Sequence, residues 1–298
     1  MIKVLITGSN GLLGQTLLKQ LLDTRCNVIA ISKGKNRFPT EDGYHYFGID
    51  ITNTDLLLST IRAVKPHFII NAAAITNVDF CEDNKELCDA VNVDAVKHLV
   101  AVTKELNAHL IHISTDFIFD GTKGSYKETD IPNPVNYYGK SKLLAEEVIV
   151  NSTIDYTILR TILVFGKVAK MNKGNLVLWL KEKLEDKDEV TIVNDQFRMP
   201  TYVEELARAC LLAMQEEAKG IFNISSNKLL SIYEMAQQIA EVFELDENLI
   251  KPISTATLNQ KAKRPPKTGF NLDKSIKILG FQSKSFKENL QKFKEKLI

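Results

Sequence analysis

The sequence predicts an α/β fold, a doubly wound parallel (Rossmann) sheet with a smaller C-terminal α/β substrate lobe. Three observations predict it. An apolar segment at residues 2–7 runs directly into a glycine-rich turn at residues 8–14. Strand-like and helix-like segments then alternate to residue 161, which is typical of right-handed βαβ units on a parallel sheet. Beyond residue 161 the alternation becomes irregular, which indicates a second lobe.

The glycines of the first turn follow the spacing G-x-x-G-x-x-G, at Gly8, Gly11 and Gly14. This spacing permits a tight turn, a close approach of the backbone to a pyrophosphate, and close packing of the next helix. That helix is predicted over residues 15–22, with its N-terminal amides and dipole toward the phosphates. The alternative is an ordinary glycine-rich turn. The order of strand, glycines and helix favours a dinucleotide site.

The remaining elements follow from apolar periodicity. In the first part, strands are predicted at 27–32, 44–49, 67–71, 109–114 and 156–161, and helices at 54–64, 82–107 and 137–151. In the second part, a polar loop is predicted at 167–173, helices at 176–184, 203–214, 232–243 and 286–297, and strands at 190–194 and 221–224. We therefore expect an NAD(P)-binding Rossmann domain at 1–165, rejoined at about 200–220, and a discontinuous substrate lobe within 166–298.

Length, net charge and the distribution of apolar residues indicate what kind of molecule the protein binds. The chain has 298 residues, enough for one large domain or two modest ones, and 38 basic residues against 37 acidic ones give a net charge of +1. This balance gives no electrostatic reason to expect nucleic acid or an anionic membrane. No apolar run is long enough to cross a bilayer, and the chain starts on a strand rather than a signal peptide. A cytoplasmic protein with a small-molecule partner is expected.

Cysteine and histidine give no metal-site pattern. The four cysteines lack the Cys-x-x-Cys and Cys/His spacings that zinc sites use, so reduced, structural cysteines and no metal are expected. The five histidines are scattered along the chain. For His109 and His112, which flank a predicted strand, a packing or surface role is favoured over a ligand role.

Tyr138 and Lys142 form the most informative pair of side chains. They are four residues apart on a predicted helix and therefore share one face of it. On that face an ammonium group can stabilise a phenolate and draw the tyrosine pKa from about 10 toward neutrality. Such a phenol can donate a proton to a carbonyl. A Tyr-x-x-x-Lys motif is weak evidence by itself, and its weight here comes from the predicted nucleotide fold.

Further candidates follow three of the predicted strands, because ligands of open parallel sheets bind beyond the carboxyl ends of the strands. They lie at 71–74, 114–116 and 160–161. The alanines at 72–74 either let a flat cofactor ring lie against the backbone or simply pack. Ser114 or Thr115 can place a hydroxyl on a carbonyl oxygen that is being reduced. Together with the Tyr/Lys pair, this set indicates hydride transfer with proton transfer.

In these residues the chain resembles the extended short-chain dehydrogenase/reductase superfamily and, within it, the dTDP-4-dehydrorhamnose reductase family. The resemblance implies that Thr115 orients a sugar ketone, that Tyr138 donates the proton, and that Lys142 holds the nicotinamide ribose and tunes Tyr138. The implied reaction is NAD(P)H-dependent reduction of the C4 ketone of a nucleotide-linked 4-keto-6-deoxyhexose, dTDP-4-dehydrorhamnose to dTDP-L-rhamnose. The matching blocks are 71–79 with Glu82, 114–121, 138–142 with Glu146, and 194–196 leading to 200–201.

The preferred cofactor can be argued from the second strand. NAD-selective sites usually end this strand with an acid that binds the ribose, whereas this strand ends in Ser32 and Lys33, with Lys35 and Arg37 nearby. We therefore expect NADPH to be used at least as well as NADH. The expected cofactor-binding residues, for NADP(H) or NAD(H), are Gly8, Asn10, Gly11, Leu12, Leu13, Gly14, Ser32, Lys33, Asp50, Ile51, Ala72, Ala73, Ala74, Thr76, Tyr138 and Lys142.

Departures from the family pattern fall where the family touches its substrate. The family usually has Tyr at Phe117, an aromatic residue at Ile75, Trp at Leu163, and small residues at 198–199, which are Arg and Met here. The reaction is therefore better supported than the substrate. Arg198 either meets a diphosphate or sugar hydroxyl or lies on the surface, and the basic loop 261–267 is either a solvated face or a diphosphate site. The expected substrate contacts are Asp116, Phe117, Gln196, Arg198 and Arg264.

Two other functions are compatible with the same family resemblance. One is an epimerase or dehydratase that acts on another nucleotide sugar with a tightly bound NAD. The other is a non-catalytic subunit like the regulatory subunit of methionine adenosyltransferase, against which the intact Thr115, Tyr138 and Lys142 weigh. The sugar, the nucleotide base, a homodimer and a metal bridge between subunits are left open.

Overall fold

A seven-stranded parallel sheet forms the centre of the computed structural model, which describes residues 1–171, 174–258 and 260–297. Its strand order is β12-β7-β5-β4-β1-β2-β3, and every neighbouring pair is parallel. This confirms the predicted doubly wound sheet. The strands are β1 (Lys3–Thr7), β2 (Asn27–Ser32), β3 (Tyr44–Gly48), β4 (Phe68–Asn71), β5 (His109–Thr115), β7 (Asp155–Thr161) and β12 (Gly220–Ile224).

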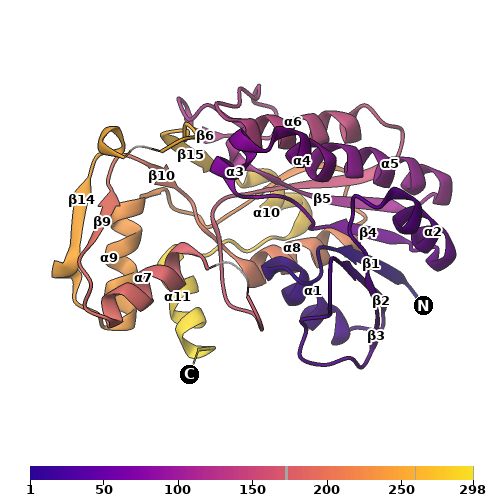
Figure 1. The fold of residues 1–298 in the computed structure, drawn as a ribbon, viewed down its shortest axis with the longest axis horizontal. Coiled ribbons are helices and arrows are strands. Elements are labelled where there is room, and N and C mark those ends of the chain that lie inside the picture. Colours follow the sequence, from indigo (N-terminus) through magenta and orange to yellow (C-terminus); the bar gives the residue numbers. More distant parts are fainter. Residues whose placement is uncertain (172–173, 259, 298) are drawn as a thin grey trace.

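Helices cover both faces of this sheet, as Figure 1 shows. On one face, apolar side chains of α1, α8 and α10 pack on the strands, and on the other those of α2, α5 and α6 do. Two separate apolar cores therefore hold the sheet between layers of helix. The helices are α1 (Leu12–Leu22), α2 (Thr54–Val64), α5 (Ala95–Leu106), α6 (Tyr137–Val150), α8 (Val203–Gln215) and α10 (Asp273–Leu279).

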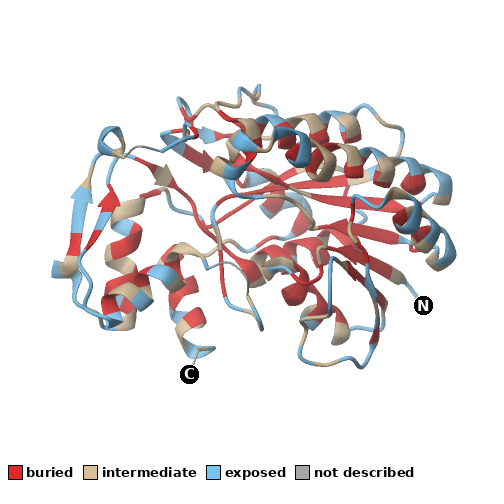
Figure 2. Cartoon of the chain, in the orientation of Figure 1, coloured by how far each residue is buried: buried red, intermediate tan, exposed pale blue. Residues whose placement is uncertain are grey.

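The second lobe is built from α7 (Leu176–Glu185), α9 (Ile232–Phe243) and α11 (Phe286–Glu295), which share one apolar core. Of the two strands predicted in this region, only one belongs to the second lobe: β9 (Val190–Val193) pairs with β14 (Ile250–Ile253) beside α9. The other, at residues 220–224, is β12 of the main sheet. Figure 2 shows the buried faces of these helices turned toward one another. Short strands complete it: β6 (Gly124–Tyr126), β8 (Val164–Phe165), β10 (Phe197–Arg198), β11 (Thr201–Tyr202), β13 (Leu230–Ser231) and β15 (Lys267–Phe270).

The chain passes between the two parts more than once. The β12 strand and helix α8 return to the main sheet from beyond residue 200, and β6 leaves it to pair with β15 in a four-stranded sheet of order β13-β10-β15-β6. The proposed division at about residue 165 stays a prediction. The loop predicted over 167–173 falls partly on residues 172–173, which lie outside the described residues.

The single long helix predicted over 82–107 is wrong. The region begins earlier, as α3 (Val78–Asp83), because the Asn77 side chain caps it by accepting from the Phe80 amide at 3.2 Å. It breaks at Asn84, whose side chain donates to the Phe80 carbonyl, and resumes as α4 (Lys85–Asp89). A π-turn at Ala90–Asp94 then leads into α5. The Asn77 cap thus sets the start of α3, and the non-helical backbone of Asn84, with φ −126° and ψ 56°, separates α3 from α4.

Within the residues that the structure describes, no helix is both long and apolar enough to cross a membrane.

Candidate functional site

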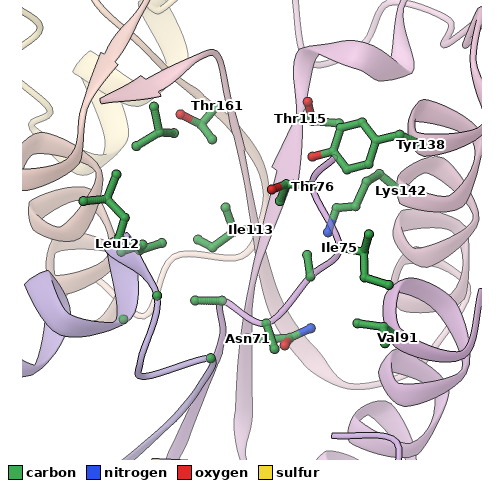
Figure 3. Close-up of a pocket in the computed structure, with 18 of the residues that line it drawn as sticks. Leu12, Asn71, Ile75, Thr76, Val91, Ile113, Thr115, Tyr138, Lys142 and Thr161 are labelled. Atoms are coloured by element: carbon green, nitrogen blue, oxygen red, sulfur yellow. The ribbon is translucent and has the colours of Figure 1, made fainter. Parts of the chain in front are cut away.

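A cavity of about 1070 Å³ opens beyond the carboxyl ends of the strands, where the sheet meets the second lobe. Figure 3 shows Tyr138 and Lys142 extending into it from α6, near Thr115 and Thr76, with Leu12 and Ile113 across from them. Every residue expected in the catalytic, cofactor and substrate sets lines this cavity, whereas the further candidate Arg160 does not, because its guanidinium is buried against Glu146. The residues of these three sets are Gly8, Asn10, Gly11, Leu12, Leu13, Gly14, Ser32, Lys33, Asp50, Ile51, Ala72, Ala73, Ala74, Thr76, Thr115, Asp116, Phe117, Tyr138, Lys142, Gln196, Arg198 and Arg264.

The glycine turn joins β1 to α1, and two of its glycines, Gly8 and Gly14, leave no room for a side chain. Gly8 has φ +69°, and a Cβ there would lie 2.7 Å from the Ala73 amide nitrogen. A Cβ on Gly14 would lie 2.5 Å from Ser9 Cα. Gly11 caps α1 without any side-chain hydrogen bond, so the amides of the first turn remain available to an anion. The turn and the alanine wall thus fit a dinucleotide pyrophosphate.

Asn10 holds the loop after β2 against the glycine turn. Its Nδ2 donates to the Lys35 carbonyl at 2.9 Å, and its Oδ1 accepts from the Arg37 amide at 2.9 Å. The Lys33 ammonium instead pairs with Asp50, with 2.8 Å between Nζ and Oδ2, and this pair holds the pKa of Asp50 below its usual value. Arg37 lines the cavity and makes no ion pair within the described part of the chain. Arg37 is therefore a cavity-lining cation, in the loop after β2, that no acidic side chain of the described residues neutralises.

Thr115 and Tyr138 meet at the tip of β5. The Thr115 hydroxyl accepts from the Phe117 amide at 3.2 Å and donates to Asp116 at 3.1 Å. Burial raises the pKa of Tyr138 above its usual value, and the neighbouring Thr115 hydroxyl opposes that rise. The phenol is consequently protonated near neutral pH, which is the state that a proton donor needs.

Lys142 lies one helical turn beyond Tyr138 and is 2% exposed. Burial lowers its pKa to about 8, and its Nζ lies 2.9 Å from Nε2 of His112 on β5. The expectation that Lys142 draws the tyrosine pKa toward neutrality is therefore not met in this structure, because burial dominates at both groups. Of the packing and surface roles expected for His112, the structure shows packing, because the ring is buried and hydrogen-bonded to Lys142 and Asn71. Strand alternation was the available signal, since His112 faces α6 together with Leu110.

The wall beside Tyr138 is fixed by Asn92 in the π-turn. Its Oδ1 accepts from the Ile75 amide at 2.8 Å, and its Nδ2 donates to the Ile75 carbonyl at 3.1 Å and to the Ser141 hydroxyl at 3.0 Å. One side chain thus ties the loop after β4 to the helix that carries Tyr138. No sequence pattern indicated this role, because a π-helical segment has no periodic signal of its own.

The expected substrate side is lined by two arginines whose charges are already engaged. Arg198 is 3% exposed, and its guanidinium donates to the Phe197 and Pro265 carbonyls at 2.7 Å each and lies 3.8 Å from Asp116. Arg264 pairs with Asp79 through two hydrogen bonds of 2.7 and 2.6 Å. Arg198 is therefore not a surface residue. Both arginines bind the basic loop 261–267 to the cavity wall from inside.

A Rossmann sheet whose glycine turn shares one cavity with a threonine, a tyrosine and a lysine defines an NAD(P)H-dependent oxidoreductase of the extended short-chain class. Comparison with known families agrees, since residues 2–298 match the model of the RmlD substrate binding domain. The chain belongs to that family. It is 33% identical to the dTDP-4-dehydrorhamnose reductase of Aggregatibacter actinomycetemcomitans over 98% of each chain. It is also 31% identical to the methionine adenosyltransferase 2 subunit beta of Danio rerio, over 95% of this chain and 86% of that one.

Solved structures of dTDP-4-dehydrorhamnose reductases share the whole architecture. The enzyme from Clostridium acetobutylicum superimposes with a TM-score of 0.88 at 30% identity, over 99% of both chains. The enzyme from Bacillus anthracis, solved in complex with NADP, gives 0.86 at 28% identity, over 99% of this chain and all of that one.

Proposed function

We propose that this protein reduces the C4 ketone of a nucleotide-linked 4-keto-6-deoxyhexose with NADPH or NADH, converting dTDP-4-dehydrorhamnose to dTDP-L-rhamnose. The observation that carries the proposal is the meeting of Thr115, Tyr138 and Lys142 at the cavity that the glycine turn also lines. The similarity to dTDP-4-dehydrorhamnose reductases over nearly the full length supports the substrate.

Each of the three side chains has a distinct task. A bound NAD(P)H supplies the hydride. The Thr115 hydroxyl, freed from Asp116 by a rotation about its C–O bond, donates a hydrogen bond to the ketone oxygen and orients it. The protonated Tyr138 then gives its proton to the oxygen as negative charge develops there. The Lys142 ammonium stabilises the phenolate that is left.

The direct test is an absorbance assay of the purified protein with NADPH and dTDP-4-dehydrorhamnose. We expect the NADPH absorbance to fall in proportion to the sugar added. An absence of oxidation at saturating concentrations of both would remove this substrate. A protein that purifies with NAD already bound and isomerises a nucleotide sugar without net oxidation would instead be an epimerase.

The regulatory-subunit alternative has support of its own, because the similarity to methionine adenosyltransferase 2 subunit beta is nearly as high. The buried, complete Thr115/Tyr138/Lys142 set favours the enzyme, since a purely regulatory protein has no need of it. An inactive protein that co-purifies with a methionine adenosyltransferase catalytic chain would reverse this choice.

Arg37 is expected to set the preference for NADPH. It lines the cavity without an ion pair to any of the described residues, whereas the Lys33 ammonium is paired with Asp50. Arg37→Ala should raise the KM for NADPH about tenfold and leave that for NADH nearly unchanged, because one charge-assisted hydrogen bond to the 2′-phosphate is lost. Steady-state kinetics with both cofactors measures this. Lys33→Ala is the matched control and should have a smaller effect, and equal losses with both cofactors in Arg37→Ala would exclude the assignment.

A homodimer and a cytoplasmic location stay predictions. Light scattering during gel filtration gives the mass of the assembly, and fractionation of the source cells gives the location.

A further inference from the structure

A line of buried polar side chains starts at Lys142 and continues behind it through residues that the proposed reaction does not use. It comprises Lys142, His112, Asn71 and Thr7, each no more than 2% exposed, and we call it the buried polar chain. Lys142 Nζ lies 2.9 Å from His112 Nε2, and His112 Nδ1 lies 3.0 Å from Asn71 Nδ2. The Thr7 hydroxyl donates to Asn71 Oδ1 at 2.6 Å and accepts from the Ala73 amide at 3.4 Å.

The charge of the imidazole in this chain is fixed by its surroundings. Burial, together with the nearby Lys142, lowers the pKa of His112 well below its usual value, so the ring is neutral. A neutral imidazole carries one N–H donor and one bare nitrogen acceptor. His112 can therefore donate toward Lys142 and accept from Asn71, or accept from Lys142 and donate toward Asn71, but it cannot accept on both sides.

The two arrangements correspond to two charge states of Lys142. In the structure, Asn71 Nδ2 faces the His112 ring and donates to it, so His112 Nδ1 must be the bare nitrogen. The ring hydrogen is then on Nε2, and the Lys142 nitrogen accepts it as a neutral amine. An ammonium has only donors, so it requires a bare Nε2 and a hydrogen on Nδ1. In that case Asn71 must turn its Oδ1 toward the ring. The chain ends at the Ala73 amide, which cannot take up a proton, so it cannot carry a proton out of the cavity.

We propose that His112 is a positioning residue for Lys142, which it holds at the cavity wall in both charge states by exchanging the hydrogen between its two ring nitrogens. The role of Lys142 in catalysis rests on the proposed function, but the exchange in the ring does not.

Both charge states of the lysine lie within reach of ordinary conditions, because burial lowers the pKa of Lys142 to about 8. The other ionisable groups that face it are Glu146 and Tyr138 of α6 and Cys88 of α4. Glu146 is itself paired with Arg160 of β7, with 2.7 Å between the charged atoms. His112 supplies the hydrogen bond to Lys142 from the strand side. Without it, the buried amine would lose the partner that fixes its position at the cavity wall.

Nitrogen NMR of the protein labelled with 15N-histidine reads the ring directly and needs no substrate. Between pH 6 and 10, the hydrogen of the His112 ring should move from Nδ1 to Nε2 with a midpoint near 8, the signals being assigned by their loss in His112→Gln. In Lys142→Met the ring should keep one tautomer throughout. A ring that does not change in the wild-type protein, or that changes equally in Lys142→Met, would overturn the inference.

The pH profile of NADPH-dependent turnover supplies a second readout that a merely structural role would not move. Activity should fall as pH rises through the pKa of Lys142, because the ammonium is the working form. His112→Phe keeps a ring but removes both the acceptor for the ammonium and the donor to the neutral amine. Because the hydrogen bond of the charged form is the stronger of the two, the ammonium loses more, and this alkaline limb should move down by about one pH unit. His112→Gln restores an acceptor and should bring the limb back.

His109→Gln is the matched control, since His109 is buried on the same strand but bonds Thr157 instead of Lys142. The alkaline limb of the pH profile of His109→Gln should stay where it is in the wild-type protein. An unmoved limb in His112→Phe, or equal shifts in His112→Phe and His112→Gln, would contradict the proposal. Because the NMR measurement needs no turnover, a failure of the proposed reaction and a failure of this inference give different results.

Discussion

Tyr138→Phe should lower turnover by about two to four orders of magnitude, the usual contribution of a positioned proton donor. The ring and its contacts remain, including the edge-on packing against Phe117, so the fold and cofactor binding should be preserved. Only the proton that goes to the ketone oxygen is lost. The decisive comparison is kcat from NADPH oxidation beside the Kd for NADPH from fluorescence titration.

Tyr137→Phe is the matched control for this change. The Tyr137 hydroxyl donates to Asp89 at 2.6 Å and does not line the cavity. The Tyr137→Phe variant should keep turnover within about twofold of wild type, since the hydroxyl that it lacks lies outside the cavity. Undiminished activity in Tyr138→Phe would mean that another group donates the proton.

Gly8→Ala should weaken NADPH binding by about 100-fold, which is about 2.7 kcal/mol. The added Cβ would lie 2.7–2.8 Å from three backbone atoms of Ala72 and Ala73, none of which can move without displacing the cavity wall. The left-handed φ of +69° adds a further cost of about 1–2 kcal/mol for any residue with a Cβ. Isothermal titration with NADPH gives the affinity, and thermal unfolding gives the stability.

Gly280→Ala separates the two causes. Gly280 ends α10 with a similar φ of +63°, and no atom lies within 4 Å of a Cβ built there. This variant should lose stability through backbone strain alone and bind NADPH as wild type does. If Gly8→Ala bound NADPH as tightly as Gly280→Ala, the turn would not be the pyrophosphate site.

The main sheet could be predicted because its signals are local. Strands such as Asn27–Ser32 and helices such as Thr54–Val64 were predicted to the residue, since continuous apolar strands and 3.6-residue periodicity mark buried parallel sheets and their helices. Strands of two residues, such as Phe197–Arg198, show no periodicity and were missed. They form only because distant segments supply their hydrogen-bonding partners.

The site was predictable where a motif carries its own geometry. The Tyr138/Lys142 pair needs only a helix, and the glycine turn needs only a strand and a helix in order. What the sequence did not reveal depends on contacts between distant elements. His112 bonds Lys142 across 30 residues, and Arg198 bonds the Pro265 carbonyl across 67. No local pattern reports such pairings, so both histidine and arginine were left with alternatives that the fold then decided.

Hydride transfer from NADPH to a sugar ketone is the reaction that we assign to this cavity. Its most direct test uses NADPH carrying deuterium on the transferred position of C4, with dTDP-4-dehydrorhamnose as acceptor and mass spectrometry of the product sugar. Our account predicts one deuterium at C4 of the sugar for each NADPH oxidised. Product without deuterium, or no product from a protein that binds NADPH, would contradict it.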